Sequence, residues 1–199
     1  MIKNIVFDLG RVLVDFNPIS YMEQLGLSSE IIDKLSNIIF HSQEWVDYDS
    51  GKLLHNTDIA NKLVLEHPEV GKEIKLVLKD DWVTIHTLRE DMAQFLVSLK
   101  ERGYNIYILS NLSIDSYGFI SQYEFFKYID GGVYSYEEKV SKPDENIYNA
   151  LLEKYSLIPE ETVFIDDSPK NIEGAIKLGI NGIIHNDIDS TKIALEQML

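Results

Sequence analysis

The sequence predicts an α/β fold in which helices cover both faces of a parallel β-sheet. Short apolar runs rich in β-branched residues recur along the chain, and helical stretches separate them. Strands that are buried on both faces have this near-continuous apolar character. The predicted strands are residues 2–7, 104–109, 162–165 and 182–185. Strands that alternate with helices are typical of a doubly wound sheet, whose ligands bind at the carboxyl ends of the strands.

Cap and turn signals delimit the helices between these strands. Residues 87–90 have the spacing of a capping box, and Gly103 is suited to end the helix that it opens. Pro143 and Pro169 each stand where a proline is favoured, at the first position of a predicted helix. The sequence therefore predicts helices directly before the second, third and fourth strands.

The interval after the first strand is too long for a single crossover helix. It exceeds a βαβ unit of ~30 residues by roughly 70 residues. Helical stretches without a convincing strand fill the surplus, at residues 19–25, 29–40, 57–66 and 69–81. We therefore expect a core of residues 1–16 and 87–199, and an inserted small α-helical cap of residues 17–86. The cap is expected to dock over the carboxyl end of the first strand.

Composition narrows the class of protein. The chain has 199 residues, of which 45% are hydrophobic and 26% are charged, as in ordinary globular domains. It has no cysteine, which excludes disulfides and thiol nucleophiles, and its net charge of −15 disfavours nucleic acid and anionic membranes as partners. No stretch approaches the ~20 apolar residues of a membrane span. We expect a cytoplasmic protein with a small-molecule partner; monomer and homodimer stay equally open.

Polar side chains stand at the ends of three predicted strands. They are Asp8, Ser110, Asn111, Asp166 and Asp167, with Lys142 opening a helix nearby. The carboxyl ends of neighbouring parallel strands lie only ~5 to 10 Å apart, so these side chains are expected to share a pocket. Clustered carboxylates suit a hard cation such as Mg²⁺. A hydroxyl, an amide and an ammonium suit the oxygens of a phosphate.

Four segments, in this order, resemble motifs of the haloacid dehalogenase-like (HAD) superfamily. They are residues 7–15 (FDLGRVLVD), 109–111 (LSN), 141–144 (SKPD) and 164–175 (FIDDSPKNIEGA). The resemblance covers residues 1–15 and 88–199, and it implies a Rossmann-like core. The insert fits the small helical cap found after the first motif in many members. The Asp-Leu-Gly of the first motif is similar to that of some sugar-phosphate phosphatases.

The resemblance also implies a reaction and a role for each residue. Asp8 would attack phosphorus and form an aspartyl phosphate. Ser110 and Asn111 would bind the transferring phosphoryl group, and Lys142 would offset its charge. The implied ligands of Mg²⁺ are Asp8, the backbone carbonyl of Gly10 and Asp167, with Asp166 nearby. The implied function is a Mg²⁺-dependent phosphatase for a small-molecule phosphomonoester such as a sugar phosphate.

Gly10 departs from the family pattern. Most phosphatases of the superfamily carry an aspartate there as general acid and base, a contribution of about 10²–10⁴ in rate. Its loss predicts a preference for good leaving groups, unless Asp15 or an acid of the insert supplies the proton. We also expect a positive φ at Gly10, a backbone conformation that residues with a side chain resist.

Two alternatives to the phosphatase remain. They are a 2-haloacid dehalogenase, which lacks that acid and needs no metal, and a non-catalytic phosphate-binding pseudoenzyme. The pair Asp166-Asp167 argues against the dehalogenase.

A few further residues have ambiguous roles in the sequence. Trp45, Tyr48 and Asp49 are predicted to lie in a loop that faces the site, with Trp45 as a packing residue. Asp15 either braces the turn into the insert or takes part in the chemistry. Asn171 either lies close to the metal site or is a surface amide. The histidines show no metal-ligand spacing.

Overall fold

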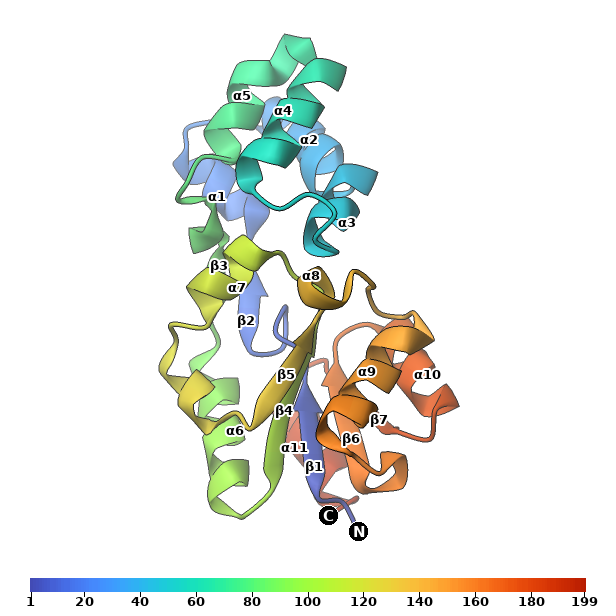
Figure 1. The fold of residues 1–199 in the computed structure, drawn as a ribbon. Helices are drawn as coiled ribbons and strands as arrows, with labels where there is room; N and C mark the ends of the chain where they lie inside the picture. The colour runs from blue at the N-terminus through green and yellow to red at the C-terminus, as the bar shows by residue number, and fades with distance from the viewer.

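The computed structural model describes all residues from 1 to 199, and its centre is a five-stranded parallel sheet (Figure 1). The strand order is β5-β4-β1-β6-β7. The strands are β1 (Asn4–Phe7), β4 (Asn105–Ser110), β5 (Gly131–Tyr134), β6 (Thr162–Asp166) and β7 (Asn181–Ile184). Phe7 in β1 pairs with Ile108 and Ile165, which fixes the register of the three central strands. The predicted parallel α/β sheet is confirmed, and β5 is an additional strand.

Helices cover both faces of the sheet, which explains why its strands are apolar on both sides. Ile5 and Phe7 point into a core shared with α6 (Glu90–Glu101) and α11 (Ile188–Glu196). Val6 points into the opposite core, shared with α9 (Glu145–Tyr155) and α10 (Pro169–Lys177). Shorter elements complete this part, namely α7 (Ile114–Ile120), α8 (Ser135–Glu138), η4 (Glu124–Tyr128) and η5 (Pro159–Glu161).

The inserted residues form a helical layer beyond the carboxyl end of the sheet, at the top of Figure 1. Its helices are α1 (Pro18–Gln24), α2 (Ser29–Leu35), α3 (Gln43–Asp49), α4 (Asn56–Glu66) and α5 (Gly71–Val77). A short π-helix, η1 (Ser36–Phe40), follows α2, and two short 3₁₀ helices, η2 (Pro68–Val70) and η3 (Trp82–Ile85), follow α4 and α5. These elements bury a hydrophobic cluster of their own around Tyr48 and Trp82. Across the whole chain, no helix combines the length and apolar character of a membrane span.

A short antiparallel ribbon joins the helical layer to the sheet. It consists of β2 (Val14–Phe16) and β3 (His86–Leu88), and Phe16 pairs with His86. The predicted capping box at residues 87–90 is therefore wrong: Thr87 lies in the ribbon, opposite Asp15, and α6 begins only at Glu90. The backbone groups of β3 are satisfied by pairing with β2 rather than by a helix cap.

Other local signals have mixed outcomes. Pro169 occupies the first turn of α10, as predicted, but Pro143 precedes the N-cap of α9. Asp144 is that N-cap, and its side chain accepts a hydrogen bond of 2.9 Å from the backbone N–H of Asn146. The predicted loop around Trp45 is the helix α3. Ser42 caps this helix by accepting a hydrogen bond of 3.1 Å from the Trp45 backbone N–H.

Candidate active site

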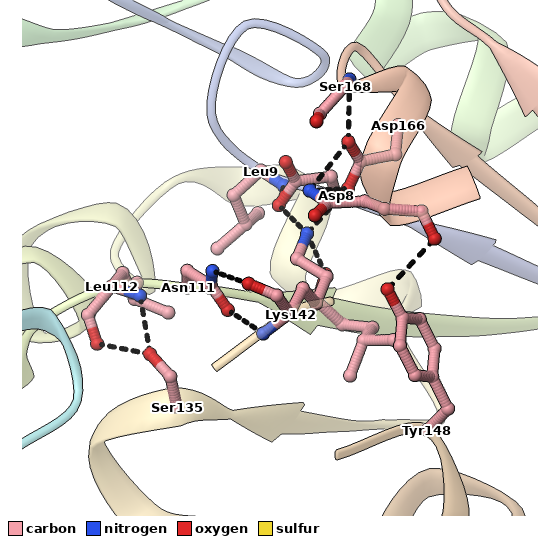
Figure 2. Close-up of polar contacts among 11 residues, drawn as sticks. Asp8, Leu9, Asn111, Leu112, Ser135, Lys142, Tyr148, Asp166 and Ser168 are labelled. Carbon is pink, nitrogen blue, oxygen red and sulfur yellow. Dashed lines mark hydrogen bonds and ion pairs between the residues drawn. The ribbon is translucent and has the colours of Figure 1, made fainter. Parts of the chain in front are cut away.

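The carboxyl edge of the sheet brings together the polar residues that the sequence places at strand ends. Asp8 directly follows β1, Ser110 is the last residue of β4, and Asp166 is the last residue of β6. Because β1 lies between β4 and β6, the three positions are neighbours. Lys142 reaches them from the loop before α9, and all four residues are buried. Figure 2 shows Asp8, Lys142 and Asp166 pointing toward one another.

Lys142 is the centre of the polar network. Its Nζ lies 2.9 Å from Asp8 Oδ1 and 2.6 Å from Asp166 Oδ2, and it donates a 2.9 Å hydrogen bond to the carbonyl of Leu109. These three partners use all three protons of the ammonium group. Burial disfavours the ammonium, but the two carboxylates raise the pKa of Lys142. The lysine is therefore held as a fixed positive charge between two acids.

Asp8 is held by donors on one side of its carboxylate. Its Oδ1 accepts a 2.7 Å hydrogen bond from the backbone N–H of Leu9 as well as the contact with Lys142. Burial raises the pKa of Asp8, while Lys142 and a hydrogen bond from Ser110 oppose that rise. The second oxygen, Oδ2, is the one that is not tied to the lysine.

Asp166 has its hydrogen-bonding capacity largely filled. It accepts a 2.8 Å bond from the backbone N–H of Ser168 and two 3.0 Å bonds from Nδ2 of Asn171, besides its contact with Lys142. The hydroxyl of Tyr148 in turn donates to the backbone carbonyl of Asn171 at 2.8 Å. Of the two readings of Asn171, the structure favours the one near the site. Asp166 orients Lys142 from one side while Asn171 fixes Asp166 from the other.

The three acids of the site lie close enough to share one cation. One carboxylate oxygen from each of Asp8, Asp166 and Asp167 lies within 4.8 Å of the others. Asp167 is only partly buried, and its nearest cation is Arg11, whose Nη1 lies 3.6 Å away. Burial and the neighbouring Asp166 raise the pKa of Asp167. An all-oxygen set with surplus negative charge fits a hard divalent cation such as Mg²⁺.

Asn111 has a different environment from that of Ser110. Its side chain exchanges two hydrogen bonds with the backbone of Lys142, because Nδ2 donates to the carbonyl at 3.0 Å and Oδ1 accepts from the N–H at 2.8 Å. Figure 2 shows this paired contact. Asn111 thereby anchors the loop that delivers Lys142. It also lines the cavity above Asp8, so the predicted contact with a phosphoryl group stays a prediction.

A cavity of about 200 Å³ opens above Asp8, between the sheet and the helical layer. The side of the sheet contributes Asp8, Gly10, Arg11, Asn111, Leu112, Ser116 and Asp167. The opposite side contributes Phe16, Trp45, Asp49 and His86. Trp45 thus borders the cavity as well as packing in the hydrophobic cluster of the helical layer. Phe16 and His86 were missed by the sequence reasoning, because only the ribbon pairing, which no motif signals, brings them here.

His86 and Gly10 have features that the sequence does not reveal. Nε2 of His86 lies 3.0 Å from Oγ of Ser116, and Nδ1 is buried without a partner. Burial lowers the pKa of His86 to about 4.

The expectation of a positive φ at Gly10 is wrong, since the left-handed residue of this turn is Arg11, with a φ of 58°. A Cβ added at Gly10 would meet no atom within 4 Å. The turn therefore has room for a side chain at Gly10.

Comparisons with known proteins agree with this geometry. A family model described as haloacid dehalogenase-like hydrolase matches residues 2–179. The D-ribitol-5-phosphate phosphatase of Bacteroides thetaiotaomicron is 28% identical over 193 residues, which are 90% of this chain and 89% of that protein. The sesquiterpene phosphatase astK of Aspergillus oryzae is 26% identical over 200 residues, covering 99% of this chain and 96% of that protein.

One solved structure is informative about the site as well as the fold. It is a HAD family enzyme from Bacteroides thetaiotaomicron in complex with magnesium and inorganic phosphate. It has a TM-score of 0.71 and 25% identity, and the match covers 92% of this chain and 93% of that one. The family model spans most of the chain, and all four motif segments meet at one edge of one sheet. The chain therefore belongs to the haloacid dehalogenase-like hydrolases.

Proposed function

We propose that this hydrolase is a Mg²⁺-dependent phosphatase that cleaves a small-molecule phosphomonoester through an aspartyl phosphate on Asp8. The observation that carries the proposal is the arrangement of Asp8, Lys142 and Asp166, with Asp167 completing a group of three acids. A buried lysine beside the attacking carboxylate favours the approach of an anionic substrate. The relatives named as phosphatases support the same reaction class.

Each residue has a role that follows from its contacts. Asp8 attacks phosphorus with the oxygen that is not tied to Lys142, and the ester oxygen departs with its electron pair. Lys142 balances the charge that gathers between Asp8 and the phosphoryl group, while Ser110 and Asn111 hydrogen-bond its oxygens. Asp8, the carbonyl of Gly10 and Asp167 would hold Mg²⁺, with Asp166 behind them. A bound Mg²⁺ would supply Lewis-acid stabilisation of the phosphoryl oxygens.

The substrate is proposed to be a small phosphorylated metabolite such as a sugar phosphate. The cavity of about 200 Å³ is smaller than the ~300–1,000 Å³ of pockets for drug-sized ligands. One relative is named for D-ribitol 5-phosphate, a compact polyol phosphate. The division into a core of residues 1–16 and 87–199 and a cap of residues 17–86 belongs to this proposal, with the cap selecting the substrate.

The dehalogenase alternative is disfavoured by the carboxylates. A dehalogenase uses no metal, so it has no catalytic need for three carboxylates around one point. Without a cation, the repulsion among these carboxylates would destabilise the folded protein. Asp167 is the sharpest case, because burial and Asp166 raise its pKa, and the cation that pairs with it, Arg11, is largely exposed. A divalent cation removes that repulsion.

The test is release of inorganic phosphate from a panel of sugar, nucleotide, acyl and aryl phosphates, with Mg²⁺ and with excess chelator. We expect turnover that needs Mg²⁺. Asp8→Asn should lower it to below about 1% of wild type, because an amide is a poor nucleophile. Asp167→Ala should weaken Mg²⁺ binding measured by calorimetry. Activity that survives chelation would overturn the metal assignment, whereas metal binding without any turnover would identify a pseudoenzyme.

A further inference from the structure

The sheet side of the cavity offers no proton for the leaving group. Asp8 and Asp167 are proposed to bind phosphorus and metal, and Gly10 has no side chain. Arg11 is permanently charged and pairs with Asp167. A phosphomonoester with an alcohol leaving group needs a proton on the departing oxygen, a contribution of about 10²–10⁴ in rate. The donor must therefore come from the opposite wall.

That wall contains two titratable side chains, His86 and Asp49. Burial lowers the pKa of His86 to about 4, so the imidazole is neutral near pH 7. A neutral imidazole is a very weak acid, and the nearest partner of its Nε2 is Ser116. His86 is thus unsuited to protonate a substrate. Asp49 is the remaining candidate.

Asp49 is held in place over the sheet edge by contacts of the segment around it. It is the last residue of α3, and its backbone carbonyl accepts a 2.6 Å hydrogen bond from Oγ of Ser135. Two residues later, the carbonyl of Gly51 accepts a 2.8 Å bond from Nζ of Lys139. Both donors lie in or directly after α8, which follows strand β5. The end of α3 is therefore tied to the edge of the sheet.

The environment of the Asp49 carboxyl group favours its protonated form. Asp49 is partly exposed, and the desolvation of its carboxyl group raises its pKa to about 8, although hydrogen bonds from the Ser113 backbone and the Trp45 side chain oppose the rise. No cation is among the groups that shift it. A carboxylic acid kept neutral by burial is a form in which enzymes present a general acid. Asp49 shares its cavity with Asp8 on the facing wall.

We infer that Asp49, carried by the cap, is the general acid that protonates the departing alcohol oxygen, in place of the aspartate that is missing at Gly10. The inference rests on the proposed phosphatase function. In the first step Asp8 bonds to phosphorus, the P–O bond to the alcohol breaks, and its oxygen takes the proton of Asp49. In the second step water attacks the aspartyl phosphate and gives a proton to the Asp49 carboxylate, which restores both acids and releases phosphate.

The inference changes which substrates are expected. Without a donor, the enzyme would be limited to acyl, aryl and anomeric phosphates, whose leaving groups depart as anions. With Asp49 as donor, phosphates of ordinary alkyl alcohols, such as a polyol phosphate, become substrates too. The cap would then contribute to the chemistry as well as to selectivity.

The test is the leaving-group dependence of kcat/KM, which reports the release of the alcohol and not the hydrolysis of the aspartyl phosphate. The series runs from para-nitrophenyl phosphate through phenyl phosphate to an alkyl phosphate such as glycerol phosphate. For Asp49→Asn we expect a loss of ~100-fold or more on the poorest leaving group and of less than ~5-fold on para-nitrophenyl phosphate, following the range for general acids. This ratio is independent of the fraction of folded enzyme. Asp47→Asn is the matched control, since Asp47 lies on the same helix and pairs with Lys52. It should leave the ratio unchanged.

A second variant separates proton donation from a structural role. Adding Gly10→Asp to Asp49→Asn should restore a wild-type ratio, because the Gly10 position has room for a side chain. An equal loss on all leaving groups in Asp49→Asn, or none, would overturn the inference while the phosphatase function stands. If wild type releases phosphate from no member of the series and Asp8→Asn behaves identically, the proposed function fails, and the inference with it.

Discussion

The two walls of the cavity are built in different ways. On the sheet side, Asp8 lines the cavity at the end of β1. It belongs to a buried polar cluster with Ser110 and Asp166, which end the adjacent strands, and with Lys142, which bonds to Asp8 and Asp166. On the other side, the ribbon contributes Phe16 and His86, and one cap helix contributes Trp45 and Asp49. Charge dominates the first wall and aromatic surface the second. The sheet topology thus fixes the positions of the polar cluster, while the ribbon and the helical layer shape the facing side of the cavity.

The largest expected effect tests whether Lys142 is the centre of the sheet-side wall. Lys142→Met removes the shared partner of two buried acids and leaves their charges uncompensated. We expect the free energy of unfolding to fall by about 3–5 kcal/mol near pH 7.5, the usual cost of breaking a buried ion pair. Urea unfolding followed by circular dichroism measures it.

The matched control is Lys127→Met, because Lys127 forms an exposed pair with Glu124 at 2.9 Å. Such a surface pair contributes only about 0–1 kcal/mol. If both variants lost the same small amount, the buried network would not organise its wall, and the contrast between the two walls would disappear.

The second prediction concerns the pH dependence of stability that the buried His86 causes on the opposite wall. Because the folded-state pKa of His86 is about 4 against 6.5 in the unfolded chain, the unfolded chain binds more protons between these values. Acid therefore destabilises the fold as pH falls through 6.5, and this contribution levels off below about pH 4. Going from about pH 7.5 to about pH 4 should cost wild type about 3 kcal/mol more than His86→Phe.

Phenylalanine keeps the aromatic contacts of His86 with Phe16 and Trp82, so the difference between the two proteins isolates titration from packing. Stability curves in urea at a series of pH values provide the measurement. Parallel curves for the two proteins would mean that His86 is hydrated in the native state, and that this wall is more open than its contacts indicate.

The smallest expected effect tests a hydrogen bond that links helix α3 of the cap to helix α7 of the core. The hydroxyl of Tyr48 in α3 donates a hydrogen bond to Asp115 in α7, which also accepts a 3.0 Å bond from the Asn56 backbone N–H. Tyr48→Phe should lower the free energy of unfolding by about 1–2 kcal/mol, since a bond to a charged acceptor is lost. Tyr128→Phe, which removes a hydroxyl without a hydrogen bond in the protein, should change it by less than about 0.5 kcal/mol. If Tyr48→Phe left the free energy of unfolding unchanged, the attachment of the cap would not depend on this hydrogen bond.

The sheet wall could be predicted from the sequence because strand ends in a parallel sheet are geometrically forced together. Each of the residues Asp8, Ser110 and Asp166 follows a run whose apolar pattern is unmistakable. The four predicted strands differ from the structure by one or two residues at their ends, as expected for frayed termini. Gly103 has the positive φ that its predicted place after α6 requires.

The rest depends on contacts that no local pattern encodes. β5 (Gly131–Tyr134) begins with two glycines, which weaken the strand signal, and it exists because β4 offers an edge to pair with. The ribbon strands span three residues each, too short for periodicity to show. The cap wall therefore becomes visible only when Phe16 and His86 are placed in space.

The ribbon between sheet and cap has a mechanical consequence. Phe16 and His86 are paired neighbours in the ribbon, and both also border the cavity. The two chain crossings between the layers thus line the cavity above Asp8. A bend in the ribbon would move both cavity-lining rings together. A change in the tilt of the helical layer would therefore change the shape of the cavity at these two rings.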